Sequence, residues 1–128
     1  MSCDTLTQMN SKTGNKIETF YHYDQAASAT DITFPHSNSL FYLALGANGE
    51  CGEISDHIKK SIRDDGLFSV VTPKRRELIL KEIGDTMWYL NKMARVLGSS
   101  LAEVAQMNID KLRSRATRNK LRGSGDER

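Results

Sequence analysis

Two pairs of acidic residues carry most of the chemical information in this sequence. Glu50 and Glu53 form the first pair, and Glu82 and Asp85 form the second. Both pairs lie in stretches with helical apolar periodicity, and residues three apart on a helix share one face, with Cβ atoms about 5–6 Å apart. If the two helices pack with these faces inward, four carboxylates converge, and their repulsion requires compensating positive charge. Oxygen ligands favour hard divalent cations, so we predict a Mg²⁺ site at which Mn²⁺ could substitute.

The alternative interpretation places these acids on solvated helix faces, paired with lysines. The pattern occurs twice beside apolar stripes. Glycines lie four residues before Glu50 and Glu53, at Gly46 and Gly49, and Tyr89 lies four residues after Asp85. A ferritin-like di-iron site is disfavoured because it requires Glu-x-x-His motifs on two helices. Here His57 follows Glu53 by four positions.

Four helices are predicted to position the acids. The first is predicted over residues 17–30, and the second begins after the polar cluster 37–39 and ends near Asp65-Gly66. The best strand candidate, residues 67–71, is too short and isolated to build a sheet. The predicted fold class is therefore all-α and four-helix-bundle-like, and we expect it to be oligomeric.

The third and fourth helices have clear boundary residues. Thr72-Pro73 is typical of an N-cap followed by a first-turn proline, and Gly98 supplies the C-terminal stop. Ser100 and Glu103 have the spacing of a capping box that opens the fourth helix.

Four glycines lie inside the acidic helices, although each costs about 1 kcal/mol relative to alanine. These glycines are Gly46, Gly49, Gly52 and Gly84. They allow either a close approach of the two helices or access of a metal or phosphate to the backbone, and both explanations can hold together. No strand is predicted before them and no Gly-Lys-Ser/Thr follows, which excludes P-loop and Rossmann interpretations.

The composition indicates one domain of 128 residues with a net charge of +2 and a hydrophobic fraction of only 38%. We expect a partner subunit to help complete the core. We expect no signal peptide, because the N-terminal residues are polar, and no membrane-spanning stretch. Cys3 and Cys51 suggest neither a disulfide framework nor a zinc site, so a reduced, cytoplasmic setting is expected.

The acidic motifs and their flanks resemble those of a known family, the MazG-like all-α nucleoside triphosphate pyrophosphohydrolases. The matching segments are Gly49-Glu-Cys-Gly-Glu53, Lys59-Lys60, Lys81-Glu-Ile-Gly-Asp85, Trp88-Tyr89-Leu90 and Asn108-x-x-Lys111-Leu112-x-x-Arg115. The resemblance covers about residues 20–128 and implies a single domain over 1–128, with an N-terminal extension over about 1–15. The tail, about 123–128, resembles that of short, often phage-encoded members and is expected to be mobile. For such a member the host cytoplasm is the expected location.

The resemblance implies hydrolysis of a (deoxy)nucleoside triphosphate to the monophosphate and pyrophosphate, with two or three Mg²⁺ ions. Glu50 or Glu53 would orient the attacking water, and all four acids would bind metal. A purine deoxynucleotide such as dGTP is favoured, with pyrimidine triphosphates or phosphoribosyl-ATP as alternative substrates. Small family members resemble homodimers, often paired into homotetramers.

The fourth helix carries a basic face that fits a triphosphate. Lys111, Arg115 and Arg118 recur at i, i+4 and i+7, with Asn108 one turn before them, and Lys59 could add a contact. The alternative is a solvated basic face or a non-enzymatic module that binds nucleic acid. We expect a phosphate-binding face and no stable nucleic-acid partner.

Aromatic side chains are natural platforms for a base, although at helical spacing they more often pack in a core. The resemblance implies a base pocket walled by the first helix and a neighbouring subunit. The candidates are Tyr23, Thr30, Trp88 and Tyr89.

Overall fold

The computed structural model describes residues 16–31 and 39–118. It contains four helices in these ranges and no strand, which confirms the predicted all-α class. The helices are α2 (Phe20–Ala29), α3 (Leu40–Asp65), α4 (Pro73–Val96) and α5 (Leu101–Thr117). The expected N-terminal extension and C-terminal tail lie outside the described residues.

The helix boundaries follow the local signals in the sequence. The hydroxyl of Thr72 accepts a hydrogen bond from the backbone N–H of Arg75 at 3.2 Å, so α4 begins with the predicted cap and proline. Gly66 and Gly98 follow α3 and α4 with φ of 66° and 76°, a left-handed conformation that favours glycine. The first helix starts three residues later than predicted, because Thr19 caps it.

The capping box of α5 forms only in part. The hydroxyl of Ser100 accepts from the backbone N–H of Glu103 at 3.2 Å, as predicted. The Glu103 carboxylate, however, accepts from the hydroxyl of Ser99 at 2.7 Å. The start of α5 is therefore anchored by two neighbouring serines.

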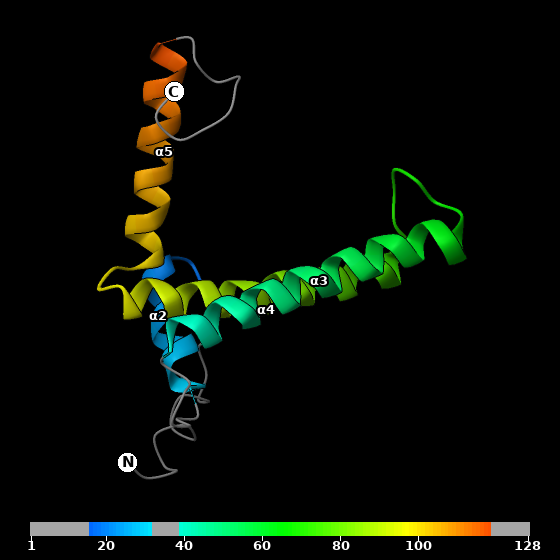
Figure 1. Ribbon diagram of the computed structural model, residues 1–128, viewed down its shortest axis with the longest axis horizontal. Helices are drawn as coiled ribbons and strands as arrows, with labels where there is room; N and C mark the ends of the chain where they lie inside the picture. The colour runs from blue at the N-terminus through cyan, green and yellow to red at the C-terminus, as the bar shows by residue number, and fades with distance from the viewer. Residues whose placement is uncertain (1–15, 32–38, 119–128) are drawn as a thin grey trace.

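Helices α3 and α4 run antiparallel, side by side, and form a long hairpin (Figure 1). Helix α2 packs against α4 and α5 near the end of this hairpin, where α4 finishes. Helix α5 projects away from the hairpin, so the four described helices of one chain do not close into a bundle (Figure 1).

The apolar core of the described residues is small. Its buried members are Leu43 and three alanines, Ala27, Ala47 and Ala94. Large apolar side chains remain exposed on α3, α4 and α5, among them Leu80, Leu90, Val104, Met107 and Leu112. No described helix combines the length and the apolar character needed to cross a membrane.

Candidate functional site

Three of the four predicted acids meet between α3 and α4. Glu50 comes from α3, and Glu82 and Asp85 come from α4. Each offers one carboxylate oxygen, and these oxygens all lie within 4.8 Å of one another. The shared helix face predicted from the i, i+3 spacing of the second pair therefore faces α3.

The electrostatics show that these acids repel one another. Burial raises the pKa of Glu50 above its ordinary value, and the negative charges of Asp85 and Glu82 raise it further. Glu50 and Glu82 are half-buried, so solvent screens their repulsion only in part. A group of three carboxylates with this excess of negative charge suits a hard divalent cation such as Mg²⁺.

Glu53 lies outside this group of three. Its side chain is exposed, and its charge is the smallest contribution to the raised pKa of Glu50. It stays close to the site because it follows Glu50 by less than one helical turn. Its predicted roles as a metal ligand or as the base that orients water remain predictions.

A close contact between α3 and α4 lies beside the acids. A Cβ atom at Gly46 would overlap the ring of Tyr89, so only glycine fits this position without a shift. Gly49, Gly52 and Gly84 have open space where a Cβ would lie. Close approach thus explains Gly46, and it does not explain the other three glycines.

His57 also lies beside the acids, although the sequence motifs did not predict it as a site residue. Its Nε2 atom lies 3.5 Å from a Glu82 carboxylate oxygen, and both side chains are largely buried. Its Nδ1 atom is buried and has no hydrogen-bond partner among the described residues. A signal was present, because His57 follows Glu50 by seven positions and therefore shares its helix face.

Three of the residues predicted to bind a base line a cavity with the acids. Thr30, Trp88 and Tyr89 surround a space of about 340 Å³ together with Glu50 and Asp85. The indole N–H of Trp88 donates to the hydroxyl of Thr30 at 2.9 Å, which joins α4 to the end of α2.

Tyr23 also lies within electrostatic reach of the acids. Burial raises the pKa of its hydroxyl, and the charge of Asp85 adds to this effect. The structure thus gathers all four candidate base-binding residues near the carboxylates.

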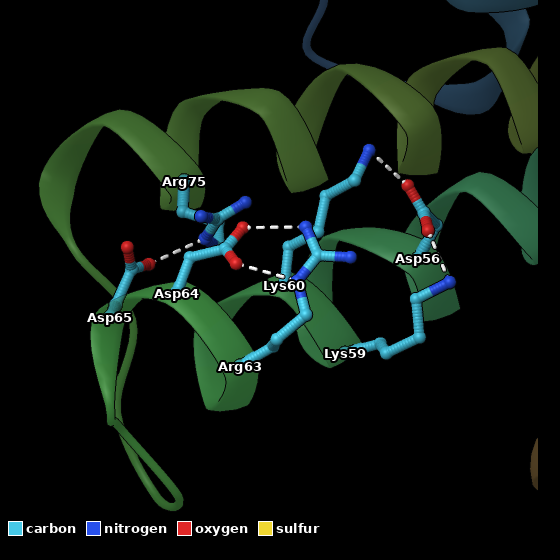
Figure 2. Close-up of polar contacts among 7 residues, drawn as sticks. All are labelled: Asp56, Lys59, Lys60, Arg63, Asp64, Asp65 and Arg75. Carbon is cyan, nitrogen blue, oxygen red and sulfur yellow. Dashed lines mark hydrogen bonds and ion pairs between the residues drawn. The ribbon is translucent and has the colours of Figure 1, made fainter.

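Lys59 has a local partner in the structure. Its Nζ atom lies 2.7 Å from Asp56, which also pairs with Lys60 (Figure 2). Hydrogen bonds from the two lysines lower the pKa of Asp56 to about 2. Lys59 is exposed, whereas Lys60 lines a cavity with His57.

The predicted phosphate-binding residues of α5 lie apart from the acids of their own chain. Asn108, Lys111 and Arg115 lie in α5, which projects away from the hairpin, and Arg118 is its C-cap residue (Figure 1). Arg115 is buried, and the others are exposed: Asn108, Lys111 and Arg118. Within one chain, the structure does not bring this basic face to the carboxylates.

Comparison with known proteins shows the family to which the chain belongs. Residues 39–118, which include the four acids of the two predicted pairs, match the MazG nucleotide pyrophosphohydrolase domain. The Gene 37 protein of Mycobacterium phage L5 is 41% identical over 113 residues, a span of 83% of this chain and 96% of that protein. No solved structure gives a significant match. The chain therefore belongs to the MazG nucleotide pyrophosphohydrolase family.

Proposed function

We propose that this protein hydrolyses a (deoxy)nucleoside triphosphate to the monophosphate and pyrophosphate in the presence of Mg²⁺. The observation that carries the proposal is the convergence of three carboxylates within the matched domain: Glu50, Glu82 and Asp85. These residues would hold the ion, because Mg²⁺ is usually bound by a few carboxylates together with substrate phosphates. When bound, Mg²⁺ supplies positive charge that stabilises the attacking and departing oxygens of an in-line displacement.

The remaining steps fall to residues of the chain. Water attacks the α-phosphorus, and Glu53 accepts its proton, because Glu53 is exposed beside the group of three acids. The bond between the α-phosphorus and the bridging oxygen breaks, and its electron pair leaves with pyrophosphate. His57 positions the Glu82 carboxylate from the side.

The base would lie against the aromatic wall of the site. Trp88, Tyr89 and Thr30 line the cavity that contains Glu50 and Asp85. A purine deoxynucleotide such as dGTP is the first substrate to test. Tyr23 would close the pocket from α2, where the charge of Asp85 already influences its hydroxyl.

We further propose that the active unit is a homodimer, or a homotetramer of two such dimers. Exposed apolar side chains on α4 and α5, such as Leu80, Leu90 and Met107, would be covered in it. The exposed basic face of α5 would then reach the acidic face of the neighbouring hairpin and supply Asn108, Lys111 and Arg118 as phosphate ligands, whereas the buried Arg115 would stay within its own chain.

The decisive experiment incubates the protein with Mg²⁺ and each ribo- and deoxynucleoside triphosphate and separates the products. Monophosphate and pyrophosphate are the expected products. Diphosphate and phosphate, or no Mg²⁺-dependent turnover of any triphosphate, would contradict the proposal. Normal turnover by an Asp85→Asn variant would show that the group of three acids has no role in the mechanism.

A further inference from the structure

A larger cavity adjoins the acid-lined one between α2 and α4. It measures about 430 Å³ and shares Trp88 with the space that contains Glu50 and Asp85. Its polar lining comes from both helices and from Asp31, the second residue after α2: Ser28, Asp31, Asn91, Lys92 and Arg95. A ligand placed against Trp88 can therefore face this cavity on one side and the carboxylates on the other.

The side chain of Asn91 in this cavity has a fixed orientation. Asn91 is only 2% exposed, and its Nδ2 atom donates to Asp24 Oδ1 at 3.0 Å. A carboxylate accepts hydrogen bonds and cannot donate them when ionised, so the amide nitrogen must face Asp24. Arg95 holds that carboxylate in place through both of its oxygens, at 3.0 and 2.9 Å.

The fixed amide leaves one acceptor unused. Asn91 Oδ1 is buried and has no hydrogen-bond partner among the described residues. Buried polar atoms are nearly always paired, and an unpaired one in a cavity needs an explanation. A ligand that carries an N–H group would provide the missing partner.

Three side chains around the cavity donate hydrogen bonds to neighbouring residues. Lys92 Nζ donates to Asp31 at 2.6 Å and lies 5.3 Å from the centroid of the Trp88 ring. The Trp88 indole donates to Thr30, and Arg95 donates to Ser28 as well as to Asp24. Asn91 Oδ1 is an acceptor without a partner among the described residues, so an amino group fits beside it better than a carbonyl group does.

The position of Asn91 along α4 suits a nucleotide that spans both cavities. It follows Asp85 by six residues, about 9 Å along the helix axis, with Trp88 midway between them. We propose that Asn91 is a specificity-determining residue, whose Oδ1 accepts a hydrogen bond from the exocyclic amino group of a nucleobase lying against Trp88. This inference rests on the proposed function, because it assigns the base end of the same substrate.

The only tryptophan of the chain gives a direct readout that requires no turnover. Trp88 fluorescence is titrated with matched deoxynucleoside monophosphates in the absence of Mg²⁺: dGMP against dIMP, dCMP against dUMP, and dAMP against deoxypurine monophosphate. We expect quenching, with at least about tenfold tighter binding of the amino-bearing member in at least one pair. A smaller difference in every pair, or no fluorescence response to any nucleotide, overturns the inference.

Substitution of Asn91 tests the residue itself. In Asn91→Ala, the two nucleotides of the selective pair should bind with about equal affinity, because the acceptor is gone. Asn48→Ala, which changes an exposed asparagine of α3, is the matched control and should keep the discrimination. Unchanged discrimination in Asn91→Ala overturns the inference. If circular dichroism shows that this variant is unfolded, the wild-type pairs decide alone.

The failure of this inference and the failure of the proposed function give different results. If the protein releases pyrophosphate with equal kcat/KM for the amino-bearing and amino-less triphosphates of every pair, the role of Asn91 is contradicted and the proposed reaction stands. If the protein binds amino-bearing monophosphates selectively but releases pyrophosphate from no triphosphate, the proposed reaction is contradicted and the role of Asn91 stands.

Discussion

The ring of Tyr89 on α4 lies against the backbone of Gly46 on α3, where a Cβ atom would overlap it. Glu50 lies one helical turn beyond Gly46, and Asp85 lies one turn before Tyr89. This contact therefore sets the distance between α3 and α4 beside the two carboxylates. Burial, together with nearby negative charge that includes Glu50, also raises the pKa of Tyr89.

Substitution of Gly46 by alanine should destabilise the protein. The added methyl group forces Tyr89 aside, and overpacking of this kind costs about 1–3 kcal/mol. Gly52→Ala is the matched control, because Gly52 lies in the same helix with open space around it. The control should stabilise by up to about 1 kcal/mol through helix propensity. Urea unfolding compares both variants, and equal stabilities would show that Tyr89 does not constrain Gly46.

Much of the fold was readable from local chemistry. Thr72-Pro73, Gly66, Gly98 and Ser100 mark helix ends because their side-chain or backbone preferences act over a few residues. The meeting of Glu50 with the second acidic pair was also predictable, since the i, i+3 spacing fixes the face on which a pair lies, but Glu53 lies outside the group that forms.

Features that depend on how helices are placed in space were not predictable. Helix α5 projects away from the hairpin that carries the acids, and no local signal in the sequence reports this (Figure 1). The polar cavity at Asn91 requires contacts between residues more than 60 positions apart, such as Asn91 with Asp24. Helical periodicity describes faces, and it does not say which distant element covers them.

Glu50 should destabilise the metal-free protein at neutral pH. Its pKa in the folded protein is raised above the ordinary value of 4.5, so the ionised form is disfavoured in the fold. We therefore expect Glu50→Gln to raise the melting temperature at pH 7 without Mg²⁺. The difference should shrink as pH falls toward and through the raised pKa, because wild-type Glu50 then takes up a proton.

With Mg²⁺ added, wild type should melt at a higher temperature than Glu50→Gln. The ion stabilises wild type by binding the folded state, whereas Glu50→Gln lacks one of the three carboxylates and gains less. Thermal melts with and without Mg²⁺ measure both effects. A metal-free variant that melts below wild type at pH 7 would contradict the repulsion among Glu50, Glu82 and Asp85.

Substitutions of Glu53 and Asp85 should impair different properties of the protein. Glu53→Gln should lower kcat by about 10²- to 10⁴-fold and leave Mg²⁺ binding nearly intact, because Glu53 lies outside the group of three acids. Asp85→Asn should weaken Mg²⁺ binding as well as turnover. Calorimetric titration with Mg²⁺ separates the two variants, and equal loss of Mg²⁺ affinity would make Glu53 a metal ligand.

Asp56 should compete with phosphate for Lys59. Hydrogen bonds from Lys59 and Lys60 lower the pKa of Asp56 to about 2, so the contribution of these pairs to stability is present above pH 3.8 and is lost as pH falls through about 2. At neutral pH, Asp56→Asn frees Lys59 and should lower KM for the triphosphate by up to about fivefold. Lys59→Ala should raise KM, and an unchanged KM in both variants would remove Lys59 from the phosphate site.

Met107 tests whether a second copy covers α5. Its side chain is 69% exposed in the single chain, and the apolar side chain of Val104, one turn before it, is exposed as well. If these residues form an interface between copies, Met107→Glu buries a charge there and should convert the assembly to a monomer, as measured by sedimentation equilibrium. Gln106→Glu, which introduces the same side chain at the neighbouring exposed position, is the control and should keep the assembly. A wild-type protein that sediments as a monomer, or a Met107→Glu variant that stays assembled, would show that this face of α5 is not an interface between copies.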